Sequence, residues 1–226
     1  MEPVIPKRLS TVDPTLIADH YHLEPCDTCL YIWEYPRHGG YKRGSTNSLI
    51  LNFKRQPIIV AESPHEAAYK QRAIAHCAAA LRALIEPPWF NHHATIVPIP
   101  PSKAPQHPDH DNRLLRTLAL ATQGYTADIR PLIAQTRSTC ADHEGTTRQA
   151  MEQLRSITRI NDHLASRPVR STLIVFDDVL NSGKHFKVAQ DLLHRRFPRS
   201  TILGVFLARC LPLRVDQQRG LPHHVE

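Results

Sequence analysis

The sequence predicts an α/β fold, because apolar runs typical of buried strands alternate along the chain with amphipathic stretches of helical period. At 226 residues the chain is long enough for one well-buried domain and short for two independent ones. Strands that alternate with helices are typical of βαβ units, whose strands are mostly parallel. We therefore expect a parallel sheet flanked by helices around one core.

The clearest helix is predicted over residues 65–86, where alanines and aliphatic side chains recur at helical spacing. Ser63 and Pro64 before it form a helix-start signal. Pro87 and Pro88 after it form a stop signal. The sequence upstream of this helix is irregular, and we expect it to form a hood over the C-terminal edge of the sheet.

The remaining elements follow from the same two periodicities. They are, in chain order, a strand over 94–99 that enters a proline-rich loop, a helix over 114–121, a strand over 128–134, a polar loop leading into a short helix within 135–162, a strand over 172–176, a helix over 184–197 and a strand over 201–208.

Composition narrows the class of partner. The formal charge is +7, from 28 Lys and Arg against 21 Asp and Glu, which favours phosphorylated ligands or nucleic acid. No run approaches the roughly 18 apolar residues of a membrane span, and the N-terminus lacks the apolar stretch of a secretory signal. Five scattered cysteines do not make a disulfide framework. We therefore expect a cytoplasmic protein without a membrane partner.

The segment 173–185, LIVFDDVLNSGKH, carries the strongest functional signal. An apolar strand ends in Asp177 and Asp178, and a short turn then opens a helix. In open α/β sheets, ligands bind beyond the carboxyl ends of the strands, and the first N–H groups of a following helix attract a phosphate. Two carboxylates at such a rim can accept hydrogen bonds from vicinal ribose hydroxyls.

The phosphate cradle is predicted over the turn itself. Gly183 lets the backbone approach a phosphate closely, and Ser182 adds a hydroxyl donor. The full set of residues predicted to bind the phosphate is Asn181, Ser182, Gly183, Lys184 and His185.

This segment resembles the phosphoribosyl pyrophosphate (PRPP) motif of the type I phosphoribosyltransferases, and the chain is most similar to their ComF-like (competence protein F-like) branch. The resemblance implies that Asp177 and Asp178 bind the ribose hydroxyls and that the turn binds the 5′-phosphate. Asn181 and His185 depart from the family pattern, which mostly has Thr at both positions. Asn181 can still donate through its amide, and a protonated His185 can pair with a phosphate.

A second motif, VPIPPSK over 97–103, resembles the family's diphosphate-binding strand and turn. The resemblance implies that Ser102, Lys103 and Arg113 meet the diphosphate, since basic side chains donate to phosphate oxygens and offset their charge. Arg137 and Arg148 flank a polar stretch where the family carries a loop that closes over the site. Both could reach the ligand from this loop, and Arg137 is a further, weaker candidate for the diphosphate. Lys54 is a weaker candidate from the upstream NSLILNFK match.

The resemblance also implies a domain division and a reaction. Residues 1–62 would form an N-terminal hood that selects the acceptor, 63–215 the phosphoribosyltransferase-like core and 216–226 a C-terminal tail. An enzyme of this family displaces pyrophosphate from the anomeric carbon of PRPP, with Mg²⁺ bridging diphosphate and ribose oxygens. The alternative is a catalytically degenerate nucleotide sensor, or an accessory subunit of a nucleic-acid-associated assembly such as a defence element.

Two clusters have the composition of metal sites. Cys26 and Cys29 form one CxxC, and ComF-like proteins often carry a zinc ribbon here, but a second CxxC is missing. His20, His22 and His38 are the histidines that could complete a zinc site. The other cluster is His107, Asp109, His110 and Asp111, in the proline-rich loop. We expect both clusters to be without metal.

Overall fold

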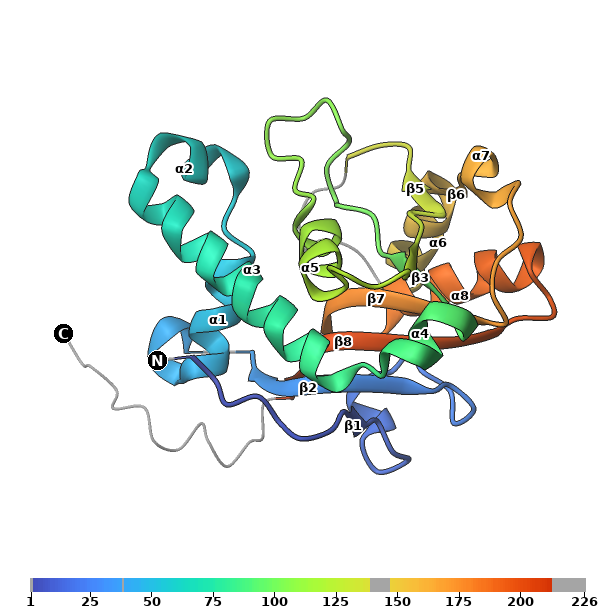
Figure 1. The fold of residues 1–226 in the computed structure, drawn as a ribbon, viewed down its shortest axis with the longest axis horizontal. Coiled ribbons are helices and arrows are strands. Elements are labelled where there is room, and N and C mark those ends of the chain that lie inside the picture. The colour runs from blue at the N-terminus through green and yellow to red at the C-terminus, as the bar shows by residue number, and fades with distance from the viewer. Residues whose placement is uncertain (1, 38, 139–146, 213–226) are drawn as a thin grey trace.

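The computed structural model describes residues 2–37, 39–138 and 147–212, with side chains described from 151 onward in the last range. Its centre is a six-stranded sheet in the order β1-β2-β8-β7-β3-β4 (Figure 1). The strands are β1 Ser10–Thr11, β2 Cys29–Pro36, β8 Thr201–Leu211, β7 Thr172–Leu180, β3 Ala94–Pro98 and β4 Asp128–Ile129. All neighbouring strands pair in parallel except β1 and β2, which are antiparallel. The predicted α/β class is thus confirmed, with a mixed sheet.

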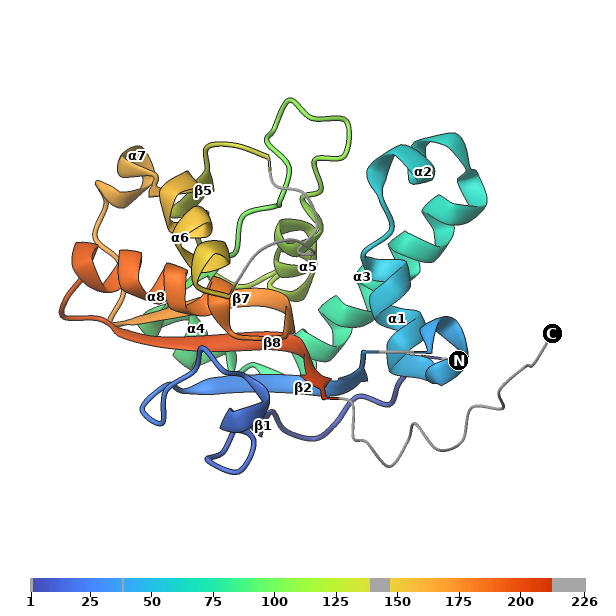
Figure 2. The same ribbon diagram turned by 180° about the vertical axis from the view of Figure 1, so that it is seen from behind.

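Helices cover both faces of this sheet (Figure 1). One face carries α3 Pro64–Leu84, α4 Pro87–His93 and α5 Arg113–Ala121. Figure 2 shows α6 Thr147–Ile157 and α8 Lys184–Arg196 on the other face. Phe176, Phe186 and Phe206 are fully buried between the layers, so the core lies around β7, β8 and α8. None of the described helices combines the length and the apolar character that crossing a membrane requires.

The long helix α3 begins and ends where its sequence signals predict. Ser63 Oγ accepts a hydrogen bond from the N–H of Glu66 at 3.4 Å, as an N-cap does, and Pro64 occupies the first turn. At the other end Ile85 has extended backbone before the two prolines that start α4.

The strand predicted over 128–134 is interrupted. Arg130 is buried between Asp128 at 2.7 Å and the carbonyl oxygens of Arg167 and Pro168, and its own carbonyl accepts from the N–H of Leu132, which bends the chain at Pro131. The chain after the bend forms β5 Ile133–Gln135, which pairs with β6 Thr158–Ile160 in a separate two-stranded sheet. α7 Asp162–Ala165 follows.

Part of the region expected to form a hood, residues 1–62, belongs to the sheet. Its first part supplies β1 and β2, with a 3-10 helix, η1 Ile17–Asp19, between them. β2 lacks the alternation of apolar and polar side chains that indicates a half-exposed strand, because the consecutive residues Tyr31, Ile32 and Trp33 are all buried. The second part, residues 40–62, forms η2 Gly40–Arg43, α1 Ser45–Phe53 and α2 Pro57–Glu62 beyond the end of β2 (Figure 1).

Candidate ribose-phosphate site

The carboxyl ends of β2, β8, β7 and β3 meet at one edge of the sheet, because these strands are parallel. A cavity of about 820 Å³ opens there, within the size range of small-molecule sites. Eleven of the residues predicted from the sequence to bind the ligand line this one cavity. They are Asp177, Asp178, Asn181, Ser182, Gly183, Lys184, His185, Ser102, Lys103, Arg113 and Lys54.

The acidic pair lies inside β7, which runs past the apolar run to Leu180. Asp178 is buried, and both of its carboxylate oxygens are engaged. Oδ2 accepts from Arg113 Nη2 at 2.6 Å, and Oδ1 pairs with Lys54 Nζ at 2.9 Å. Burial would raise the pKa of Asp178, but the two cations outweigh it and hold the pKa well below its usual range. Asp178 is therefore a permanently ionised group.

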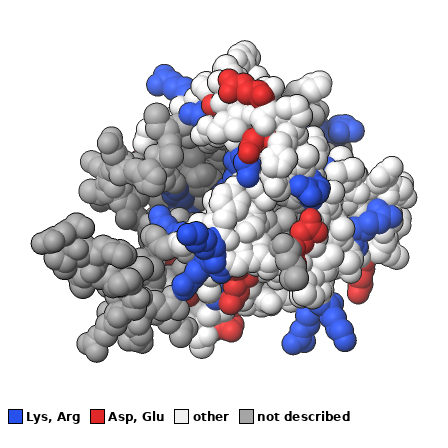
Figure 3. Space-filling model, turned by 90° about the vertical axis from the view of Figure 1, so that its left-hand side faces the viewer, with Lys and Arg blue, Asp and Glu red and all other residues white. Residues whose placement is uncertain are grey.

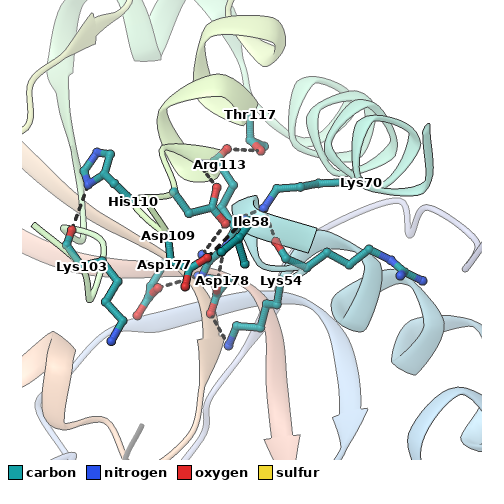
Figure 4. A network of polar contacts seen from close by, with 12 residues as sticks. Lys54, Ile58, Lys70, Lys103, Asp109, His110, Arg113, Thr117, Asp177 and Asp178 are labelled. Carbon is teal, nitrogen blue, oxygen red and sulfur yellow. Dashed lines mark hydrogen bonds and ion pairs between the residues drawn. The ribbon is translucent and has the colours of Figure 1, made fainter. Parts of the chain in front are cut away.

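The ion pairs continue away from the sheet (Figure 4). Arg113 Nη1 also pairs with Asp111 Oδ2 at 2.9 Å, and Lys70 Nζ pairs with the same oxygen at 2.6 Å. Lys70 Nζ donates in addition to the carbonyl oxygen of Arg55. The chain of charges therefore joins β7 to α5, to α3 and to the segment between α1 and α2.

Arg113 was predicted to meet a diphosphate, and the structure gives it other partners. Its guanidinium lines the cavity but bonds to Asp178 and Asp111, with 22% of the side chain exposed. Because two carboxylates already pair with it, we interpret Arg113 as a residue that holds Asp178 in place.

Asp177 differs from its neighbour in its polar partners and in the direction in which its pKa is shifted. Its Oδ1 accepts a hydrogen bond from the N–H of Asp178 at 2.7 Å, and within the described residues no cation pairs with its carboxylate. Burial and the neighbouring Asp178 raise its pKa. Asp177 is thus the member of the pair whose carboxylate is available to the cavity.

The phosphate turn is oriented by the N-terminal segment that lies behind it. His20 Nδ1 bonds to the carbonyl oxygen of Asn181, and the N–H of His22 donates to the carbonyl oxygen of Ser182 at 3.0 Å. In a trans peptide the C=O and N–H groups point in opposite directions. The N–H groups of Ser182 and Gly183 therefore point away from this segment, and among the described residues no group accepts from either.

Gly183 can adopt the backbone conformation that this arrangement of N–H groups requires. Its φ of +85° is in the left-handed region, and a Cβ there would lie 2.8 Å from Leu23 Cδ2. It is also the N-cap of α8, whose first turn contains no acidic residue. Successive N–H groups beside a left-handed residue at a helix N-terminus form a concave anion site. The turn can therefore hold a phosphate with backbone donors.

Polar side chains of the proline-rich loop hold it in place through contacts with backbone groups. His110 Nδ1 contacts the carbonyl oxygen of Lys103 at 2.9 Å, and Asp109 Oδ1 accepts from the N–H of Ile58 at 3.2 Å (Figure 4). His107 Nδ1 accepts from the N–H of Asp109 at 3.0 Å. These contacts, with the ion pairs of Asp111, use the side chains that resembled a metal cluster.

The remaining predicted residues lie outside the cavity. Arg137 is exposed and is not among the lining residues, and the segment 139–146 beyond it lies outside the described residues, as does the side chain of Arg148. Cys26 is exposed, while burial raises the pKa of the Cys29 thiol to about 12. His38 also lies outside the described residues.

Cys26 does have two potential metal ligands beside it, Glu24 and Asp27. Both carboxylates, however, pair with Lys187 Nζ, at 2.9 and 3.0 Å. A cation already occupies the position between these carboxylates, and Cys29 is not part of the cluster.

Two contributors to the site were missed in the sequence. Lys70 carried a detectable signal, since it stands on the same helix face as the buried Ala73, Ile74 and Cys77, where a lysine needs a partner. His20 carried none, because its contact joins residues 161 positions apart.

Neither a protein-family model nor a curated protein matches this chain.

Proposed function

We propose that this chain binds PRPP, or a related ribose 5-phosphate, and is a phosphoribosyltransferase-like protein. The observation that carries the proposal is the juxtaposition of Asp177 with the backbone donors of Ser182 and Gly183 on one cavity. Ribose hydroxyls need carboxylate acceptors, and a 5′-phosphate needs N–H donors. A ribose 5-phosphate needs both in one cavity, and this site supplies both.

The donor set also suits the Mg²⁺ that accompanies PRPP. This cation prefers oxygen ligands and is usually bound by one or two carboxylates together with substrate phosphates. Asp177 offers such an oxygen, since its Oδ2 has no protein partner among the described residues. Bound Mg²⁺ would supply charge neutralisation for a departing diphosphate.

The other parts of the cavity would serve the two remaining groups of a transferase reaction. Ser102 and Lys103 line it in the loop after β3, where the diphosphate would lie. Tyr35, Arg37 and Cys210 line it at the ends of β2 and β8, where the acceptor would lie. In the reaction the acceptor forms a bond to the anomeric carbon as the bond to the diphosphate oxygen breaks, and the protein contributes orientation and charge stabilisation.

One observation favours the alternative, a sensor that binds PRPP without turning it over. Both oxygens of Asp178 are taken by Lys54 and Arg113, so that one of the two carboxylates expected at the ribose is engaged. The face that includes α1 and α2 gives the nucleic-acid version of this alternative no support, since Lys and Arg there stand in separate groups with Asp and Glu among them (Figure 3).

Calorimetry with PRPP and Mg²⁺ tests the proposal on the wild type and on Asp177→Asn. The wild type should bind, and the variant should lose at least about tenfold in affinity, the effect of one lost charge-assisted hydrogen bond. Asp162→Asn, a substitution at an exposed aspartate in α7, is the matched control and should bind as the wild type does. Absence of wild-type binding at millimolar PRPP would refute the ligand assignment.

A pyrophosphate-release assay over candidate bases then separates the enzyme from the sensor. Release that depends on Asp177 supports the transferase, and binding without release supports the sensor. Lys103→Gln adds a second test, because it should weaken PRPP binding and leave the binding of ribose 5-phosphate, which has no diphosphate, unchanged.

A further inference from the structure

The phosphate turn is held from behind by a segment of the N-terminal region, residues 20–27, which we call the clasp. His20 and His22 bond to the two carbonyl groups of the turn, and Leu23 packs against Gly183. These contacts come from the loop between η1 and β2, so the clasp is remote in sequence from the turn that it touches.

The clasp is also fixed to α8, the helix that begins at the turn. Asp27 is buried and accepts from Lys187 Nζ at 3.0 Å and from Gln190 Nε2 at 2.9 Å, both on α8. The same carboxylate accepts from the N–H of Glu24 at 2.8 Å, which closes the clasp on itself. The clasp therefore cannot shift along α8 without breaking buried charged contacts.

His20 is the clasp residue with the most defined role. It is fully buried, its Nδ1 contacts the carbonyl oxygen of Asn181, and among the described residues its Nε2 has no partner. A carbonyl oxygen only accepts, so Nδ1 carries the hydrogen. Among the described residues, this hydrogen bond is the one polar contact of the ring, and we infer that it is the reason for a histidine at this position.

We propose that His20 is a positioning residue for the ligand phosphate. By holding the Asn181 carbonyl toward the clasp and away from the cavity, it directs the N–H of Ser182 into the cavity. The inference rests on the proposed function and deepens it. Without the ring donor, the Asn181–Ser182 peptide can rotate, and the N–H is then no longer preset for an anion.

The test compares substitutions that differ in whether they keep a donor. His20→Asn retains an amide N–H near the position of Nδ1, whereas His20→Leu keeps bulk without a donor. With ribose 5-phosphate as the probe, His20→Leu should weaken binding about tenfold, the equivalent of one hydrogen bond. His20→Asn should restore affinity to near that of the wild type.

His76→Leu is the matched control for lost stability. His76 also contacts a backbone carbonyl, that of Pro3 at 2.9 Å, and it stacks on Trp33 away from the turn. Its substitution should lower the melting temperature without changing phosphate affinity. Equal affinity in folded His20→Leu and wild type would overturn the proposal. If His20→Leu does not fold, His20→Gln, whose amide lies one bond further out, replaces it and should still bind more weakly than His20→Asn.

A ligand-independent readout separates this proposal from the proposed function. The ¹⁵N amide resonances of Ser182 and Gly183 should move in His20→Leu and stay in place in His76→Leu. If the wild type fails to bind PRPP and ribose 5-phosphate, the proposed function is wrong, and these resonances alone decide whether His20 orients the turn. Unmoved resonances in His20→Leu refute the positioning role whatever the ligand.

Discussion

Neutralising each aspartate of the acidic pair should have opposite effects on stability, although the two residues are adjacent. Asp178→Asn removes the partner of Arg113 and Lys54. Breaking a buried ion pair by removing one member usually costs about 3–5 kcal/mol. Arg113 keeps Asp111 at 2.9 Å, and the Lys54 side chain is 42% exposed, so water can solvate its ammonium group once Asp178 is neutral. We expect the low end, about 3 kcal/mol.

Asp177→Asn should leave the protein as stable as the wild type or more stable at neutral pH. The amide oxygen can still accept from the N–H of Asp178, and the substitution removes a buried charge that lies beside another charge of the same sign. Because the folded-state pKa of Asp177 is raised, the wild type loses stability as the pH rises from the ordinary aspartate value through that raised pKa. The variant lacks this loss, so its advantage should disappear in acid.

Urea denaturation and thermal melts followed by circular dichroism measure both effects. About 3 kcal/mol corresponds to a melting temperature lower by roughly 6–12 °C in a chain of this size. Asp162→Asn serves again as the exposed control. Equal losses for Asp177→Asn and Asp178→Asn would show that the division of roles between the two carboxylates is wrong.

Two further predictions concern the turn and the ligand. Gly183→Ala should destabilise the protein more than Gly124→Ala. Both glycines have positive φ, +85° and +84°, but only a Cβ at position 183 would meet another group, the side chain of Leu23. Equal melting temperatures of the two variants would contradict the packing of the clasp against the turn. Binding of Mg²⁺ and PRPP should weaken as the pH falls below the raised pKa of Asp177, and it should release a proton from this carboxyl group. Calorimetry in buffers of different ionisation enthalpy detects that proton. Binding that does not depend on pH would exclude Asp177 as the group that ionises when the ligand binds.

The helices, the strands and the turn between β7 and α8 were predictable because their signals are local. The helix over 64–84 follows from a cap, an apolar period and prolines, all within one stretch of chain. The segment from Leu173 to His185 likewise shows its strand, its acidic pair and its turn in order. Backbone physics of this kind acts between neighbours, so it can be read from one sequence.

The partners of the site residues were not predictable to the same degree, because they come from distant elements. Nothing near Asp178 in sequence indicates that Lys54 and Arg113 neutralise it, so these ion pairs were not predicted. The predicted contact of Arg113 with a diphosphate stays a prediction. The prediction of a hood likewise overlooked β2, whose consecutive buried residues do not alternate as those of a half-exposed strand do. Tertiary contacts decided both outcomes.

The first 62 residues therefore do more than cover the site. They supply a sheet strand beside β8, a cation on Asp178 through Lys54, and a clasp behind the phosphate turn through His20. The contacts of Lys54 and His20 meet the segment 173–185 itself, whereas β2 pairs with β8, the strand beside β7. A core without this region would keep the motif in its sequence, but Asp178 would lose one of its two cations and the carbonyl of Asn181 would lose its donor. The geometry of the proposed ligand site thus depends on both the motif and the N-terminal region. If the proposed function is right, substitutions in that region should alter ligand affinity as directly as substitutions in the motif.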